Sequence, residues 1–140
     1  MSDLKNTVRV EILNSLNILS MFDYDKFLFW CKKIEKIYTE KNKYFGLVPM
    51  KVIRPIEYSP FIAPILLKEK FIQDVKNFLN VENLKHNSNF KTEILMILHR
   101  LKNSNTNNEA IIKLKTSIQQ LDKQRGSNIR KFISNFYNYI

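Results

Sequence analysis

The side chains best suited to binding a polar ligand lie just after a short apolar run, at Arg54, Glu57 and Tyr58. They offer a guanidinium, a carboxylate and a phenol, and each of these groups forms hydrogen bonds. Residues 50–54 are mostly apolar and are followed by Pro55, which predicts a strand that ends there. Because ligands of parallel α/β sheets bind at the carboxyl ends of strands, we expect the three side chains to line a cleft. The competing interpretation is a structural corner without a ligand.

Two asparagines follow a second candidate strand. Residues 8–13 alternate apolar and charged side chains, the period-two pattern of a strand with one apolar face. Asn14 and Asn17 come directly after this segment, which places them as further candidates for lining the cleft. Asparagines at such positions also cap turns by bonding to the nearby backbone, and this structural role is the alternative.

The sequence lacks the residue combinations of independent catalysis. His86 and His99 are its two histidines and Cys31 is its one cysteine, with no partners at the spacing of a metal site. Gly46 and Gly126 are too far apart to form a phosphate-binding loop. No acid–base pair or nucleophile–histidine pair stands out. We therefore predict neither catalytic residues nor a metal site.

Helical periodicity dominates the rest of the chain, with apolar residues recurring at i, i+3, i+4 and i+7. The predicted helices cover about 22–40, 65–80, 88–102 and 107–125, with a last helix running from 129 to residue 140. In the first helix Trp30 and Cys31 fall on the apolar stripe, so we expect both in the core, Cys31 as an inert thiol. A capping box that begins at Thr106 and the glycine stop at Gly126 mark the ends of the fourth helix.

The order of these elements is strand, helix, strand and then helices, which predicts a parallel crossover followed by a helical region. We expect a single domain over residues 1–140, with a strand–helix–strand unit and proline-rich turn over 8–66 and a helical region over 67–140. The predicted fold class is α/β and helix-rich: a partial (β/α) barrel fragment with two parallel strands and trailing C-terminal helices. Two strands alone form a marginal sheet. A second polypeptide or a missing N-terminal half is therefore the expected partner.

Composition and charge restrict the class of protein. The 140 residues carry a formal net charge of +10, which makes nucleic acid a candidate partner. The positive charge is spread along the chain, however, and an AT-rich coding sequence would produce the same bias. The first residues contain no apolar signal-peptide core, and no apolar run is long enough to span a membrane. With a single cysteine and no disulfide framework, the expected location is the cytoplasm.

Three segments together resemble radical SAM proteins that carry a twitch-type C-terminal region. The segment similar to their late strand and following helix is VEILNSLNILSMFDYDKFLFWC. The one similar to their next strand and its proline-bearing turn is MKVIRPIEYSPFIAPILLKEK. The last resembles their closing LDxxRG helix junction, carried here by Leu121, Asp122, Arg125 and Gly126. The proline that these proteins carry before their last helix is absent, and Asn135 stands near its place.

The resemblance implies a C-terminal part of a radical SAM-like enzyme that supplies barrel wall and substrate-side loops. A complete family member would bind S-adenosylmethionine and an iron–sulfur cluster held by a CxxxCxxC loop. This sequence has no such loop, so it is expected to bind neither cofactor alone and to have no catalytic activity of its own. Asp122 and Arg125 are expected to form an ion pair that fixes the helix junction. The alternatives are a small basic nucleic-acid-binding protein and a helical protein-interaction protein.

Overall fold

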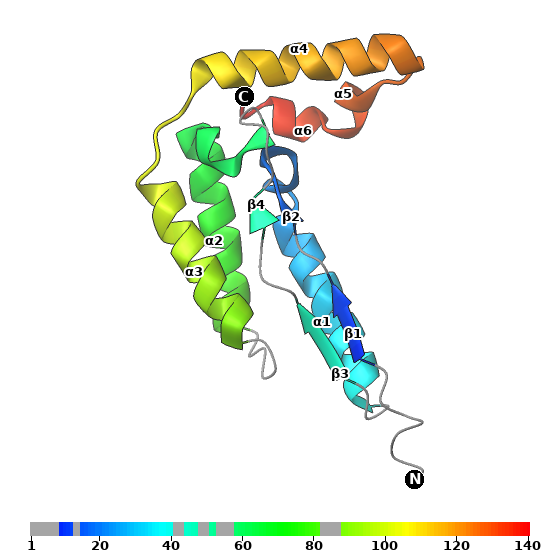
Figure 1. Cartoon of the computed structure of the whole chain (residues 1–140), viewed down its shortest axis with the longest axis vertical. Helices are drawn as coiled ribbons and strands as arrows, with labels where there is room; N and C mark the ends of the chain where they lie inside the picture. The colour runs from blue at the N-terminus through cyan, green and yellow to red at the C-terminus, as the bar shows by residue number, and fades with distance from the viewer. Residues whose placement is uncertain (1–8, 13–14, 41–43, 48–50, 53–57, 82–87) are drawn as a thin grey trace.

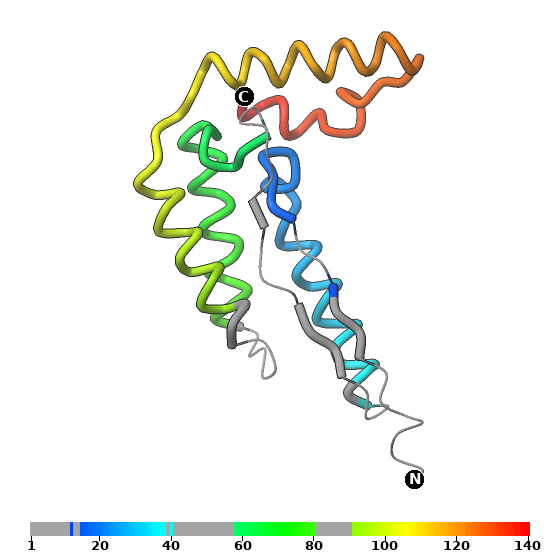
Figure 2. Tube along the Cα trace, viewed as in Figure 1, coloured from blue at the N-terminus to red at the C-terminus, as the bar shows by residue number. Residues whose placement is uncertain are grey.

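The computed structural model describes residues 9–12, 15–40, 44–47, 51–52, 58–81 and 88–140 (Figures 1 and 2). In chain order the strands and the first helices are β1 (Arg9–Ile12), β2 (Ser15–Leu16), the 3₁₀ turn η2 (Ile18–Ser20), α1 (Tyr24–Glu40), β3 (Tyr44–Leu47) and β4 (Lys51–Val52). These are followed by the 3₁₀ turn η4 (Pro60–Ile62), α2 (Ile65–Val81), α3 (Ser88–Lys102), α4 (Asn108–Arg125), α5 (Ile129–Phe132) and α6 (Ser134–Tyr137).

Three long helices form the body of the molecule. Helices α2 and α3 run antiparallel beside each other, and α1 packs against α2 on its other side (Figure 1). The stripe predicted for α2 is confirmed, because Leu67, Phe71, Val75 and Phe78 are all fully buried. Burial of such side chains is the main source of folding free energy. The core is thus built from helix against helix.

Helix α4 crosses one end of this body, and α5 and α6 run back beneath it (Figure 1). Phe136 of α6 and Leu114 of α4 are both buried, so the returning segment extends the same core. The predicted continuous last helix is wrong, because the helix breaks at Ile133. Phe132, in α5, is 86% exposed.

The helix ends follow local capping rules. The Ser59 hydroxyl accepts a hydrogen bond from the Phe61 amide at 3.3 Å, so it caps η4, with Pro60 at the first position. Gly126 ends α4 in the left-handed conformation with φ of 61°, as predicted. The N-cap of α4 is Asn107 rather than Thr106, because the Asn107 side chain accepts from the Ala110 amide at 3.0 Å.

The extended segments form two separate parallel pairs. Strand β1 pairs with β3, with Arg9 opposite Tyr44 and Ile12 opposite Leu47. Strand β2 pairs with β4, where Ser15 lies opposite Lys51. Each pair contains two strands among the residues that the structure describes.

The predicted α/β fold, a partial (β/α) barrel fragment with two parallel strands, is wrong. Helices make up most of the described chain, and the extended segments are ladders of only four and two residue pairs. The predicted partner of segment 8–13 was 50–54, whereas the described residues 9–12 pair with 44–47. Among the side chains whose burial the structure describes, most of the buried ones belong to helices and 3₁₀ turns, so helix contacts organise the described core.

Candidate functional site

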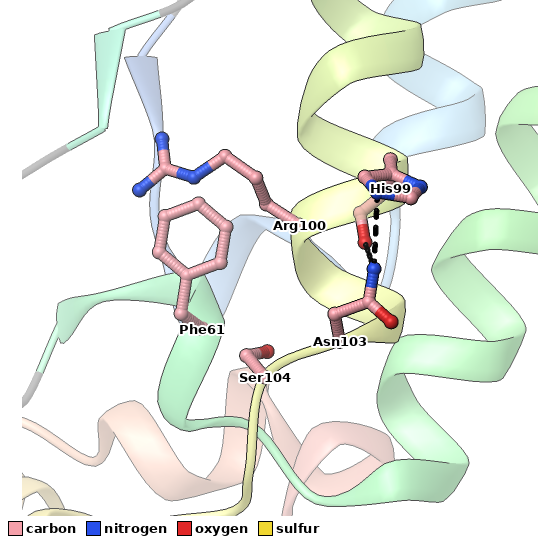
Figure 3. A pocket seen from close by; sticks show the side chains of 5 residues that line it. All are labelled: Phe61, His99, Arg100, Asn103 and Ser104. Atoms are coloured by element: carbon pink, nitrogen blue, oxygen red, sulfur yellow. Dashed lines mark hydrogen bonds between the residues drawn. The ribbon is translucent and has the colours of Figure 1, made fainter.

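A pocket opens where the C-terminal end of α3 meets η4. Its volume is about 460 Å³, within the range of small-molecule sites. Five residues line it: Phe61, His99, Arg100, Asn103 and Ser104 (Figure 3). Phe61 comes from η4, and the other four come from the last turn of α3 and the residues after it. The pocket therefore joins segments about forty positions apart in the sequence.

Two hydrogen bonds hold the walls of this pocket together. The Asn107 amide donates to the Ile62 carbonyl at 3.1 Å, and the Thr106 hydroxyl donates to the Ala63 carbonyl at 3.2 Å. Both bonds tie the α3–α4 connection to the end of η4. The pocket is thus formed by fixed backbone on either side, which lowers the ordering cost of binding.

Arg100 stacks on the aromatic ring of Phe61. Its guanidinium carbon lies 4.3 Å from the ring centroid, a cation–π distance, and Figure 3 shows the two groups side by side. No carboxylate lies among the five lining residues. Stacking holds the guanidinium through its face, so its N–H edges stay open to a ligand.

A buried lysine lies behind the pocket. Lys68 is 3% exposed, and its amine donates to the Ser104 carbonyl at 3.1 Å. Burial lowers the pKa of the Lys68 amine from its ordinary value. The salt bridges of the described residues include none to Lys68 or Arg100. Among the described residues, therefore, the positive charge of Lys68 and Arg100 has no ion-pair partner.

Two carbonyl groups in the last turn of α3, those of His99 and Leu101, are bonded within the protein. The Asn103 side-chain amide and backbone amide both donate to the His99 carbonyl, at 3.1 and 3.2 Å. The Ser104 hydroxyl donates to the Leu101 carbonyl at 2.9 Å. Basic residues in a last helical turn often serve to cap such carbonyls. Since other donors do so here, the Arg100 guanidinium is not used for capping.

The structure describes only two of the five residues that were predicted to line a cleft, Asn17 and Tyr58. Asn14, Arg54 and Glu57 lie outside the described residues, so the cleft that they were predicted to form is untested. Asn17 caps η2, and its side-chain oxygen accepts from the Ser20 amide at 3.0 Å. This is the structural alternative considered above. Tyr58 is half-buried and packs against the hydrophobic core.

The predicted ion pair between Asp122 and Arg125 is not among the salt bridges of the described residues. Asp122 instead organises the turn after α4. Its carboxylate accepts from the Ser127 hydroxyl at 2.8 Å and from the Ile129 amide at 2.6 Å. These hydrogen bonds, led by the one from Ile129, lower the pKa of the Asp122 carboxyl. Arg125 is exposed.

The single thiol is unsuited to metal binding or catalysis. Cys31 is 1% exposed, and burial raises its pKa to about 12, which leaves almost no thiolate near neutral pH. Its predicted place in the core is confirmed, but Trp30, predicted beside it in the core, is 49% exposed. Within the described ranges, no three histidine, cysteine or acidic side chains come together as a metal site would need.

The pocket residues were not predicted from the sequence. His99 and Arg100 stand in the basic last turn of a predicted helix. The missing information was the contact with Phe61, which depends on how η4 packs against α3. A local pattern carries no signal for a contact over that separation.

The geometry of the described residues is the main guide to the function of this chain. The helices that the structure describes include none with the length and apolarity needed to cross a membrane. The chain matches no protein-family model, no curated protein and no solved structure.

Proposed function

We propose that this chain is a non-catalytic C-terminal part of a radical SAM-like enzyme and works together with a polypeptide that carries the CxxxCxxC loop. The observation that carries the proposal is the pair of short parallel ladders, each with two strands among the described residues. Isolated two-strand ladders are marginal in water, because they leave hydrogen-bonding groups at both outer edges. A neighbouring polypeptide would extend or cover these edges.

An apolar face on α1 supports the same proposal. Trp30 and Ile37 are seven residues apart, so they lie on one side of the helix, and they are 49% and 47% exposed. Helix α1 also contacts β3, which brings this helix and the strand pair together. Exposed tryptophan is typical of the centre of protein interfaces. The expected occupant of this face is the cluster-bearing polypeptide.

The LDxxRG segment supports the resemblance at a second place. In radical SAM proteins with a twitch-type region it stands at a closing helix junction. In this chain Asp122 accepts hydrogen bonds at the turn between α4 and α5. The segment therefore has a junction role of the kind that the resemblance implies, through a cap rather than through an ion pair.

The described residues do not fit an iron–sulfur cluster, which needs three accessible thiolates. The chain has only Cys31, which is buried and protonated near neutral pH. Cluster binding and cleavage of S-adenosylmethionine therefore belong to the partner in this proposal. The location proposed for the assembly is the cytoplasm, whose reducing conditions preserve such clusters.

The test is co-purification with the product of the reading frame immediately upstream. The proposal expects that frame to encode CxxxCxxC and its product to form a stable complex with this chain. Trp30→Glu combined with Ile37→Glu should weaken the complex at least tenfold, because two buried carboxylates oppose binding. Ile112→Glu, at a 64% exposed apolar residue of α4, is the matched control and should not weaken it. An upstream frame without the motif, or no complex, would overturn the proposal.

Nucleic-acid binding is a second candidate, favoured by one basic surface. Lys123 and Arg125 at the end of α4 and Arg130 and Lys131 in α5 are all exposed and lie around one turn. Phosphate contacts by such residues give affinity that falls steeply with salt. Titration of a labelled duplex and a single strand at two salt concentrations tests this candidate. Absence of binding at the lower salt concentration would remove it.

A further inference from the structure

We propose that the pocket between η4 and the end of α3 binds a small organic anion, a carboxylate or phosphate carried on a flat ring. This site is separate from the α1 face, and the inference does not depend on the proposed function. It rests on the charge, the stacking and the preformed walls of the pocket.

The charge of the pocket favours an anion. Arg100 is the cationic residue of the lining, and the His99 imidazole lies on the same turn. The buried Lys68 amine adds a second cation next to the lining, because it donates to the Ser104 carbonyl. Burial of a cation is costly, and the ion pairs of the described residues include none to Lys68. A bound anion close to Ser104 would compensate that cost.

The shape of the pocket favours a ligand with a flat apolar part. Phe61 provides an aromatic wall, and the Arg100 guanidinium lies over that ring (Figure 3). A ring that enters the pocket meets the edge of this stack, while its anionic group reaches the N–H edges of Arg100. Arginine binds carboxylate and phosphate through two parallel hydrogen bonds. The volume of about 460 Å³ accommodates a group of this size.

The preformed walls favour binding over a transient surface contact. The bonds from Thr106 and Asn107 fix the α3–α4 connection to η4 before any ligand arrives. The His99 and Leu101 carbonyls accept from Asn103 and Ser104, so the partial negative charge of these two groups is offset by donors inside the protein. Both features lower the free-energy cost of placing an anion in the pocket.

The experiment is calorimetric titration of the full chain with inorganic phosphate, phenyl phosphate and benzoate. We expect saturable binding of at least one aromatic anion with a single site, and weaker binding of inorganic phosphate. If phenyl phosphate binds more tightly than benzoate, the natural ligand is a phosphate ester, and the reverse order identifies a carboxylate. No saturable binding of either aromatic anion would overturn the proposal.

Variants separate this site from general attraction to a basic protein. Arg100→Gln should lower affinity at least tenfold, whereas Lys76→Gln removes the same charge from an exposed position of α2 and should change it less than twofold. Equal losses in the two variants would contradict the proposal. Phe61→Leu keeps an apolar side chain and should reduce the preference for phenyl phosphate over inorganic phosphate. An unchanged preference would rule out the role assigned to the ring.

Discussion

At the scale of single residues, buried or fixed polar groups distinguish this chain from an ordinary helical protein. Lys68 is buried with one hydrogen bond to a backbone carbonyl, and Asp122 accepts bonds that hold the turn between α4 and α5. Neither role follows from the residue type alone. Sequence patterns placed Lys68 on a helix and Asp122 in a motif, but their partners come from segments that local patterns do not connect.

Replacement of Lys68 by methionine tests the cost of burying its amine. Methionine removes the buried cation, which stabilises the protein, and leaves the Ser104 carbonyl without its donor, which destabilises it. Each effect is about 1 kcal/mol or somewhat more, so we expect the free energy of unfolding near pH 7 to stay within about 1 kcal/mol of wild type. Urea unfolding followed by circular dichroism measures this difference.

The difference in stability between wild type and Lys68→Met should change with pH in a definite direction. The pKa of Lys68 is lower in the folded protein than its ordinary value of 10.5, so the unfolded chain binds more protons between the two values. Wild type should therefore gain stability relative to Lys68→Met as the pH rises through the lowered pKa toward 10.5. A difference that falls over this range would contradict burial of a charged amine.

Asp122 gives a pH dependence of the same sign, but in acid. Its folded pKa lies below the ordinary value of 3.8, so its contribution to stability is present above that pH and is lost as the pH falls through the folded pKa. The amide resonance of Ile129, which donates to this carboxylate, should titrate with a midpoint below 3.8. In Asp122→Asn the same transition should disappear. A midpoint at or above 3.8 in wild type would show that the cap is not formed.

At the scale of elements, the helices were predictable and the strand pairing was not. The buried stripe of α2 and the bounds of α3 follow directly from apolar spacing, because a helix presents one continuous face to the core. The alternation over residues 8–13 identified an extended segment, but the sequence analysis expected its partner at 50–54 and did not identify 44–47 as a strand. Strand β1 pairs with residues 44–47, which follow the end of α1 more closely in the sequence than residues 50–54 do. Register between distant strands is a tertiary property.

Gly126, which ends α4, has a left-handed backbone conformation that residues other than glycine rarely adopt. At φ of 61° an alanine is strained, although its Cβ would meet no atom within 4 Å. Gly126→Ala should therefore lower the free energy of unfolding by about 1 kcal/mol through backbone strain alone. Asparagine tolerates this conformation better, so Gly126→Asn is the control and should cost less. Equal stability of glycine and alanine variants in thermal unfolding would argue against the left-handed cap.

At the scale of the whole molecule, one helical core supports two exposed features, the α1 face and the η4–α3 pocket. Sequence reasoning recovered most helices but produced the wrong fold class, because the prediction gave two short extended segments the organising role. In the structure that role belongs to residues such as Phe71 and Leu114, which are fully buried at helix contacts. The prediction that Trp30 is buried was wrong for a different reason. Apolar spacing identifies one face of a helix but does not show whether another element covers that face.

Truncation of the core tests this description. Phe71 is fully buried and its ring lies 5.1 Å from that of Tyr24 on α1, so Phe71→Ala leaves a cavity between α1 and α2. We expect a loss of about 3–5 kcal/mol in the free energy of unfolding. Phe132→Ala, at 86% exposure, should cost less than about 0.5 kcal/mol. Similar losses from the two substitutions in denaturant titrations would place the core elsewhere.

The proposed role in a larger enzyme is tested most directly by 5′-deoxyadenosine formation from S-adenosylmethionine under anaerobic, reducing conditions. The chain alone, after treatment with iron and sulfide, should form none. The upstream CxxxCxxC polypeptide should form it with this chain present, and activity should fall at least tenfold without the chain or with the Trp30→Glu, Ile37→Glu variant. Cleavage by this chain alone, or full activity of the partner in its absence, would contradict the account.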